Sequence, residues 1–200
     1  MSLKLLQPPS GTQEVVAGAL KRAHKSARSF RSAIEGGTAV VAPVSPLRVY
    51  VLGLKQIVDG IGLEGAKPAG WQSLVLQGKN PVASVDFESL SNAPATFKSY
   101  NQGSHVQSTA SAIAVAESLP EVTAGDFEPR LLQTPSINLM SLWLHGGKDL
   151  LIPLDPAPHV FKPYTVYSPA DFFAQAADLA KHRSGFDDRP KVKPPGALGI

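Results

Sequence analysis

The stretch LMSLWLHGGKDLLIPL, residues 139–154, is the part of the chain that decides its fold class. A strand over 139–145 would place its odd-numbered and even-numbered residues on opposite faces, and both faces are largely apolar. Because a strand of this kind is buried on both sides, we predict that it lies in the centre of a sheet. Gly146-Gly147 then predicts a β-hairpin with a two-residue turn, in which a type I′ geometry would give both glycines positive φ. Pro153 places the far end of the second strand at an edge or outside the sheet.

Outward from this hairpin, other short segments have the β-branched or alternating apolar residues that are typical of strands. These predicted strands are 38–44, 47–52, the hairpin pair 71–77 and 82–87, and 95–100. A short helix is predicted within 54–61, where apolar residues have helical spacing.

The clearest predicted helix runs from about Ser10 to the pair Gly36-Gly37. Ser10-Gly11-Thr12-Gln13 matches a capping box, and the glycine pair is a typical helix end. Apolar residues recur at spacings of three and four and form one narrow stripe: Val16, Leu20, Ala23, Ala27, Phe30 and Ile34. Two further helices are predicted over 104–119 and 168–183. The first is closed by Pro120, and the second begins with Ser168 as cap and proline at its first position.

These elements predict an α+β fold, with a mostly antiparallel sheet of about five to seven strands. A long N-terminal amphipathic helix and two further helices pack on it. Strands do not alternate with helices as βαβ units require, so a doubly wound fold is disfavoured. We predict a single α+β domain over 10–185, an N-terminal extension over 1–9 and an extended, proline-rich C-terminal arm over 186–200.

Composition agrees with one globular domain, since the chain has 200 residues, of which 43% are hydrophobic and 18% charged. The absence of cysteine excludes a disulfide scaffold, a thiolate metal site and a cysteine nucleophile. No apolar run approaches the roughly 20 residues that span a bilayer, and Met1–Gln7 lacks the apolar core of a signal peptide. We therefore expect a cytoplasmic protein without a membrane span.

Basic residues are concentrated near the N-terminus, because residues 1–35 contain six basic and two acidic side chains. A solvated helix face and a surface for an anionic partner both explain this pattern. The candidate partner-binding residues lie on this helix and in the C-terminal arm: Lys21, Arg22, Lys25, Arg28, Arg31, Arg189, Lys191 and Lys193. A protein partner or a homo-oligomer is favoured. Nucleic acid remains an alternative partner, although the stacking aromatic residues that usually accompany nucleic-acid binding are missing from the basic face of this helix.

Catalytic and metal motifs are missing from the sequence. The five histidines have no spacing typical of metal ligands, so we predict neither a metal site nor a cofactor. We therefore predict a non-catalytic binding or assembly module that acts through protein–protein contacts. The alternative is a small-molecule-binding protein or an enzyme, with a pocket near Trp143, His145 and His159 in which Asp149 or Asp155 could join a histidine.

Overall fold

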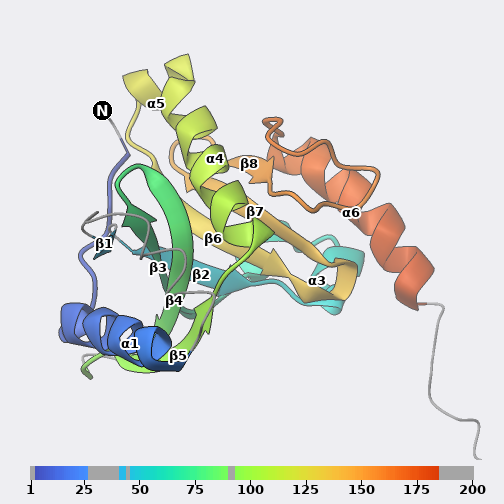
Figure 1. Ribbon diagram of the computed structural model, residues 1–200. Helices are drawn as coiled ribbons and strands as arrows, with labels where there is room; N and C mark the ends of the chain where they lie inside the picture. Colours follow the sequence, from blue (N-terminus) through green and yellow to red (C-terminus); the bar gives the residue numbers. More distant parts are fainter. Residues whose placement is uncertain (1–2, 27–40, 44–45, 90–92, 185–200) are drawn as a thin grey trace, which may run out of the picture.

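The structure is a computed structural model that describes residues 3–26, 41–43, 46–89 and 93–184 (Figure 1). The predicted continuation of the first helix to residue 35, the start of the predicted strand 38–44 and the predicted arm 186–200 lie outside the described residues.

One sheet of eight strands forms the centre of the described chain. The strands are β1 (Val41–Pro43), β2 (Leu47–Val51), β3 (Lys67–Gln77), β4 (Asn80–Glu88), β5 (Thr96–Asn101), β6 (Glu128–Thr134), β7 (Leu139–His145) and β8 (Leu150–Pro153). Their order across the sheet is β5-β4-β3-β2-β6-β7-β8. The short strand β1 also pairs with β3, along residues 75–77, whereas β2 pairs with residues 67–72 of the same strand. The predicted strands at 47–52, 71–77, 82–87, 95–100 and 139–145 are confirmed, and β7 lies inside the sheet as its two apolar faces indicate.

The helices match the sequence expectation in part. They are α1 (Thr12–Ser26), α3 (Leu54–Val58), α4 (Ser104–Ser118), α5 (Pro120–Ala124) and α6 (Pro169–Ser184), with 3₁₀ turns η1 (Gly62–Gly65) and η2 (Pro135–Ile137). Helices over 104–119 and 168–183 are thereby confirmed, whereas the long N-terminal helix is shown only as far as Ser26. None of the helices within the described ranges combines the length and the apolar character needed to cross a membrane.

The sheet is mixed, which corrects the prediction of a mostly antiparallel one. β2 and β6 run parallel in the middle of the sheet, with Arg48 opposite Arg130, whereas the other named strand pairs are antiparallel. The reason is the connection between them. After the antiparallel run β2 to β5, the chain crosses over through α4 and α5 and returns beside β2 in the same direction, as a crossover connection requires.

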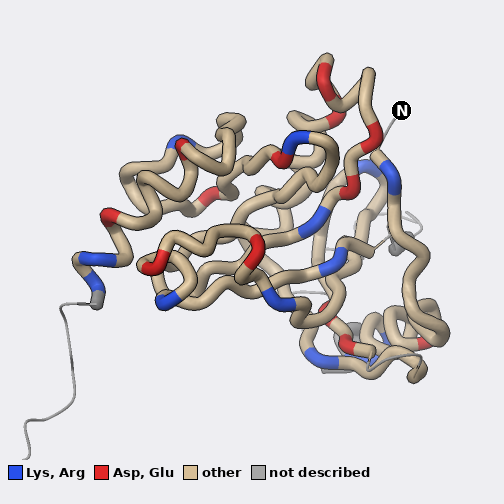
Figure 2. Tube along the Cα trace, turned by 180° about the vertical axis from the view of Figure 1, so that it is seen from behind, with Lys and Arg blue, Asp and Glu red and all other residues tan. Residues whose placement is uncertain are grey.

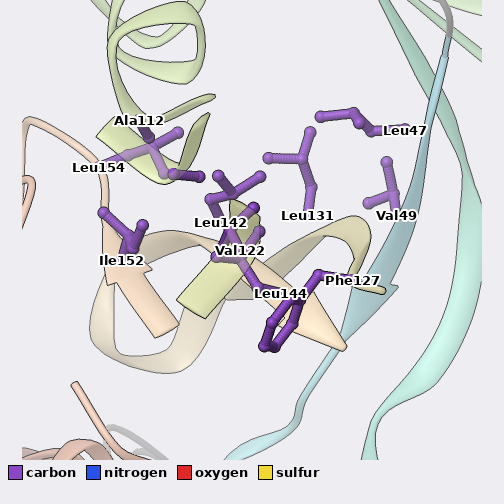
Figure 3. Close-up of a cluster of buried hydrophobic side chains, with 11 residues drawn as sticks. Leu47, Val49, Ala112, Val122, Phe127, Leu131, Leu142, Leu144, Ile152 and Leu154 are labelled. Atoms are coloured by element: carbon purple, nitrogen blue, oxygen red, sulfur yellow. The ribbon is translucent and has the colours of Figure 1, made fainter. Parts of the chain in front are cut away.

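Helix α4 covers one face of the sheet. Its Ala112 and Ala116 are fully buried, and their small side chains let the helix lie close to the strands. Figure 3 shows the apolar side chains of this layer converging from α4, α5 and the central strands. The strand residues in this cluster are Leu47, Val49, Leu131, Leu142, Leu144 and Ile152. Five of them occupy alternate positions of β2, β6 and β7.

Helices α1 and α6 lie over the opposite face, at its two ends. Phe172 and Ala176 of α6 pack with Trp143, and Val16 of α1 packs with Phe87. The strand register places the side chains of Phe87, Trp71, Arg48, Arg130, Trp143 and Leu151 in one row on this face. In Figure 2, seen from behind, the two helices flank the central strands, and Lys and Arg positions recur on the strands between them.

The β7–β8 hairpin is confirmed, but its predicted turn is wrong. Leu144 pairs with Leu150, so the connection is longer than two residues, and neither Gly146 nor Gly147 has positive φ. Gly146 is instead required by a close approach, because a Cβ there would lie 2.8 Å from Cδ1 of Phe127. A Cβ on Gly147 would meet no atom within 4 Å. The glycine pair therefore reflects packing at one position and open space at the other.

Candidate functional site

The strip of sheet between α1 and α6 holds an arginine–aromatic row, which consists of Arg48 and Tyr50 on β2, Trp71 on β3, Arg130 on β6 and Trp143 on β7. Local sequence explains part of the placement, because in β2 Arg48 and Tyr50 alternate with Leu47 and Val49, which belong to the apolar cluster beneath α4. Trp143 is buried, and the other four side chains are partly exposed. The row thus presents two guanidinium groups and the rings of Tyr50 and Trp71 on one surface, and the buried ring of Trp143 belongs to the same row.

The side chains of the row support one another. The Cζ atom of Arg130 lies 4.7 Å from the ring centre of Trp143 and 5.0 Å from that of Tyr50. Arg48 lies 5.7 Å from the ring of Tyr50 and 5.8 Å from that of Trp71. Such cation–π contacts contribute about 0.5–2 kcal/mol each, the upper end applying where water is excluded. Tyr50 and Trp143 also meet edge to face at 5.1 Å, which fixes the surface as a unit.

The two arginines differ in their charge partners. Arg130 donates from Nε to Oε1 of Glu128 at 2.6 Å and from Nη2 to Oε2 at 3.0 Å, a bidentate ion pair of two largely buried side chains. For Arg48 there is no carboxylate within ion-pair distance among the described residues. The two cations are directly opposite each other on neighbouring strands, so one positive charge of this pair stays uncompensated there.

A hollow of about 430 Å³ opens beside Arg48 and Trp71. Its other lining residues come from the chain that enters α1 and from the segment after β4: Gln7, Pro9, Ser10, Ser89 and Ala93. The volume falls in the range of about 300–1,000 Å³ that is usual for small-ligand sites. Among the described residues of this lining Arg48 is the one that carries a charge, so this part of the hollow has a positive wall.

At the far end of the row the structure brings together two residues of the predicted pocket. The rings of Trp143 and His145 are in edge contact at 5.5 Å. His145 Nδ1 lies 2.8 Å from Oδ1 of Asp149, and the same oxygen accepts the N–H of Gly146 at 3.2 Å. The third predicted residue, His159, is exposed in the turn after β8, and the structure gives no contact between it and Trp143 or His145.

A second hollow, of about 380 Å³, adjoins Asp149. Its other walls come from residues 60–64 and from the start of α6, including Phe173. Trp143, His145 and His159 do not line it. The hollow therefore faces the carboxylate of the His145–Asp149 pair, and the imidazole lies outside its lining.

The predicted basic residues are placed only in part. Lys21 and Arg22 are exposed on α1, where the guanidinium of Arg22 lies 4.6 Å from the ring centre of Phe97. Lys25 also belongs to α1. The remaining members of that set lie outside the described residues: Arg28, Arg31, Arg189, Lys191 and Lys193.

Sequence reasoning did not select Arg48, Tyr50, Trp71 or Arg130 as site residues. A partial signal was present in LRVYV, residues 47–51, where Arg48 and Tyr50 alternate with apolar residues. The spacing of residues along the sequence does not predict which strands are neighbours in the sheet. The row exists only because β3, β2, β6 and β7 are neighbours. No cluster of three or more metal-binding side chains occurs within the described ranges. The chain matches no protein-family model, no curated protein and no solved structure.

Proposed function

We propose that the protein is a non-catalytic binding module that contacts an acidic protein partner through the arginine–aromatic row. The supporting observation is the pair Arg48 and Arg130 on neighbouring strands, because Arg130 is paired with the carboxylate of Glu128 whereas Arg48 has no carboxylate partner among the described residues. Adjacent like charges repel each other, so an anionic group from outside would stabilise this surface.

The residue types of the row also suit a protein interface. Tyrosine, tryptophan and arginine are the residues most enriched among those that dominate binding energy. Here Tyr50, Trp71 and Arg48 are partly exposed, and Tyr50 and Trp71 also pack against the two apolar clusters to which α6 and α1 contribute. Their rings and guanidinium already support each other in the free protein, so little side-chain freedom is lost on binding.

The proposal is tested by partner capture with the full chain. Wild-type protein, Arg48→Gln and the exposed turn variant Lys79→Gln are immobilised and exposed to nuclease-treated lysate of the source organism. We expect the same protein to be retained by wild type and by Lys79→Gln and to be lost with Arg48→Gln. Retention should also decrease with salt, since exposed charge pairs are screened over about 8 Å at physiological ionic strength.

Three results would contradict this proposal or redirect it. Equal retention by all three proteins would remove the row from the interaction. Capture from a parallel sample of untreated lysate, together with no capture from the nuclease-treated lysate, would make nucleic acid the partner. A solution mass of twice the monomer that returns to one in Arg48→Gln would make a second copy of this chain the partner.

The alternative is an enzyme or small-molecule-binding protein that uses His145. The observation that favours it is the contact between His145 and Asp149, since a carboxylate that orients an imidazole is a common arrangement in general acid–base catalysis. Turnover of a substrate that is lost in His145→Gln, with partner capture unchanged in Arg48→Gln, would favour this alternative over the binding module.

A further inference from the structure

We propose that the hollow beside Arg48 is a binding site for a single carboxylate group, a ligand assignment that rests on the proposed function and gives it its chemistry. Arg48 and Trp71 line this hollow. Gln7 and Ser10 also line it, and their side-chain amide and hydroxyl are further hydrogen-bond donors.

The neighbouring arginine shows how such a carboxylate binds on this surface. The carboxylate of Glu128 accepts hydrogen bonds from both Nε and Nη2 of Arg130, while the guanidinium of Arg130 lies over two aromatic rings. Arg48 also lies over two rings, those of Tyr50 and Trp71, and rings that contact the face of a guanidinium leave its N–H edge free to donate. The ligand's carboxylate would therefore occupy at Arg48 the place that Glu128 occupies at Arg130.

Charge distinguishes a carboxylate from a phosphate at this site. Within the described lining of the hollow Arg48 is the one cation, so the site balances one negative charge. A phosphate monoester carries about 1.5–2 negative charges at neutral pH and would be left partly unbalanced. The planar fork of the guanidinium also matches the two oxygens of a carboxylate directly.

The carboxylate can belong to an acidic side chain of the partner or to a free organic acid, and an NMR titration distinguishes these sources. The resonance of Arg48 Nε–H is followed in the purified full chain. The probes are the monocarboxylate butyrate, acetyl-Gly-Glu-Gly-amide, the neutral peptide acetyl-Gly-Gln-Gly-amide and inorganic phosphate. We expect saturable shifts with butyrate and the glutamate peptide, none with the neutral peptide, and weaker binding of phosphate. Tighter binding of the glutamate peptide assigns the site to a protein side chain, and tighter binding of butyrate assigns it to a free acid.

Variants locate the site through a second readout, the affinity for the tighter carboxylate probe measured by calorimetry. Arg48→Gln should weaken it at least about tenfold, and Arg48→Lys, which keeps the charge and the surface, should weaken it severalfold through loss of the fork. Glu128→Gln should add a second site, because it frees Arg130, and Lys79→Gln should change nothing. Since each variant's amide spectrum reports its fold, a loss by misfolding is recognised directly.

Several outcomes would overturn the carboxylate site. These are equal binding of the neutral peptide, tighter binding of phosphate, no saturable shift, or unchanged affinity in Arg48→Gln and Arg48→Lys. Carboxylate binding at Arg48 in a protein that captures no partner would overturn the proposed function alone. Capture that depends on Arg48 without carboxylate binding would overturn this inference alone.

Discussion

Gly146→Ala should destabilise the protein, and its neighbour Gly147→Ala should not. An alanine Cβ at position 146 would lie 2.8 and 2.9 Å from two ring carbons of Phe127 and 3.0 Å from the carbonyl oxygen of Asp126. Phe127 cannot retreat freely, because it is 7% exposed and its carbonyl accepts the N–H of Lys4. Overpacking of this kind costs about 1–3 kcal/mol.

A smaller, opposing effect is common to both variants. Replacing glycine by alanine at a compatible position stabilises by about 0.4–1 kcal/mol, because the unfolded chain loses freedom. Gly147→Ala should show only this gain, since a Cβ there meets nothing within 4 Å. For Gly146→Ala the gain offsets part of the strain. We therefore expect the free energies of unfolding of the two variants to differ by about 2 kcal/mol.

Urea denaturation followed by circular dichroism measures this difference. With a slope of about 2 kcal/mol/M, the midpoint of Gly146→Ala should lie about 1 M below that of Gly147→Ala. A Phe127→Leu background supplies the control, because removing the ring should abolish most of the difference. Equal midpoints for the two alanine variants would refute the close approach of Gly146 to Phe127.

Three further predictions concern the core, a titrating group and the β7–β8 connection. Leu142→Ala removes a fully buried side chain and should lower the free energy of unfolding, measured by urea denaturation, by about 2–5 kcal/mol. Leu5→Ala, at a half-exposed position, should change it by no more than about 0.5 kcal/mol, and equal effects of the two variants would contradict the assigned core. Burial raises the pKa of Tyr100 to about 12, so its folded-state pKa lies above the ordinary value of 10.0. The stabilisation from its neutral form is complete below pH 10 and is lost as the pH rises through 12, and Tyr100→Phe should remove that dependence from stability curves measured over this range. Asp149→Ala removes the hydrogen-bond partner of His145 and of the Gly146 N–H, and it should lower the free energy of unfolding by at most about 1 kcal/mol for each lost bond. Asp149→Asn should lower it less. An unchanged free energy of unfolding in both variants would show that the β7–β8 connection does not depend on this side chain.

Much of the fold was predictable because it depends on local patterns. The run 139–145 is apolar on both faces, and this alone places β7 inside a sheet. Ser168 and Pro169 mark the start of α6 by cap chemistry, and the side chain of Ser168 accepts the N–H of Asp171 as expected. The parallel pairing of β2 with β6 was not predictable, since it depends on where the chain returns after α4 and α5.

The candidate site was less accessible to sequence reasoning than the fold. Trp143 and His145 are two residues apart on one strand, so their contact follows from the period of a strand. Arg48 and Arg130 are far apart in the sequence, and only the sheet register reveals that they are neighbours. Gly146 shows the same limit, because its constraint is the ring of Phe127, which belongs to the segment that enters β6.

The central claim is that a partner binds over the arginine–aromatic row, and oxidative footprinting of the full chain with the captured partner tests it most directly. Oxidation rates are measured for Trp71 and Tyr50 in the row, and for Phe97, which is 42% exposed and packs with α1, as the reference. We predict that the partner slows oxidation of Trp71 and Tyr50 and leaves Phe97 unchanged. Protection of Phe97 with Trp71 and Tyr50 still oxidised at the free rate would contradict the claim.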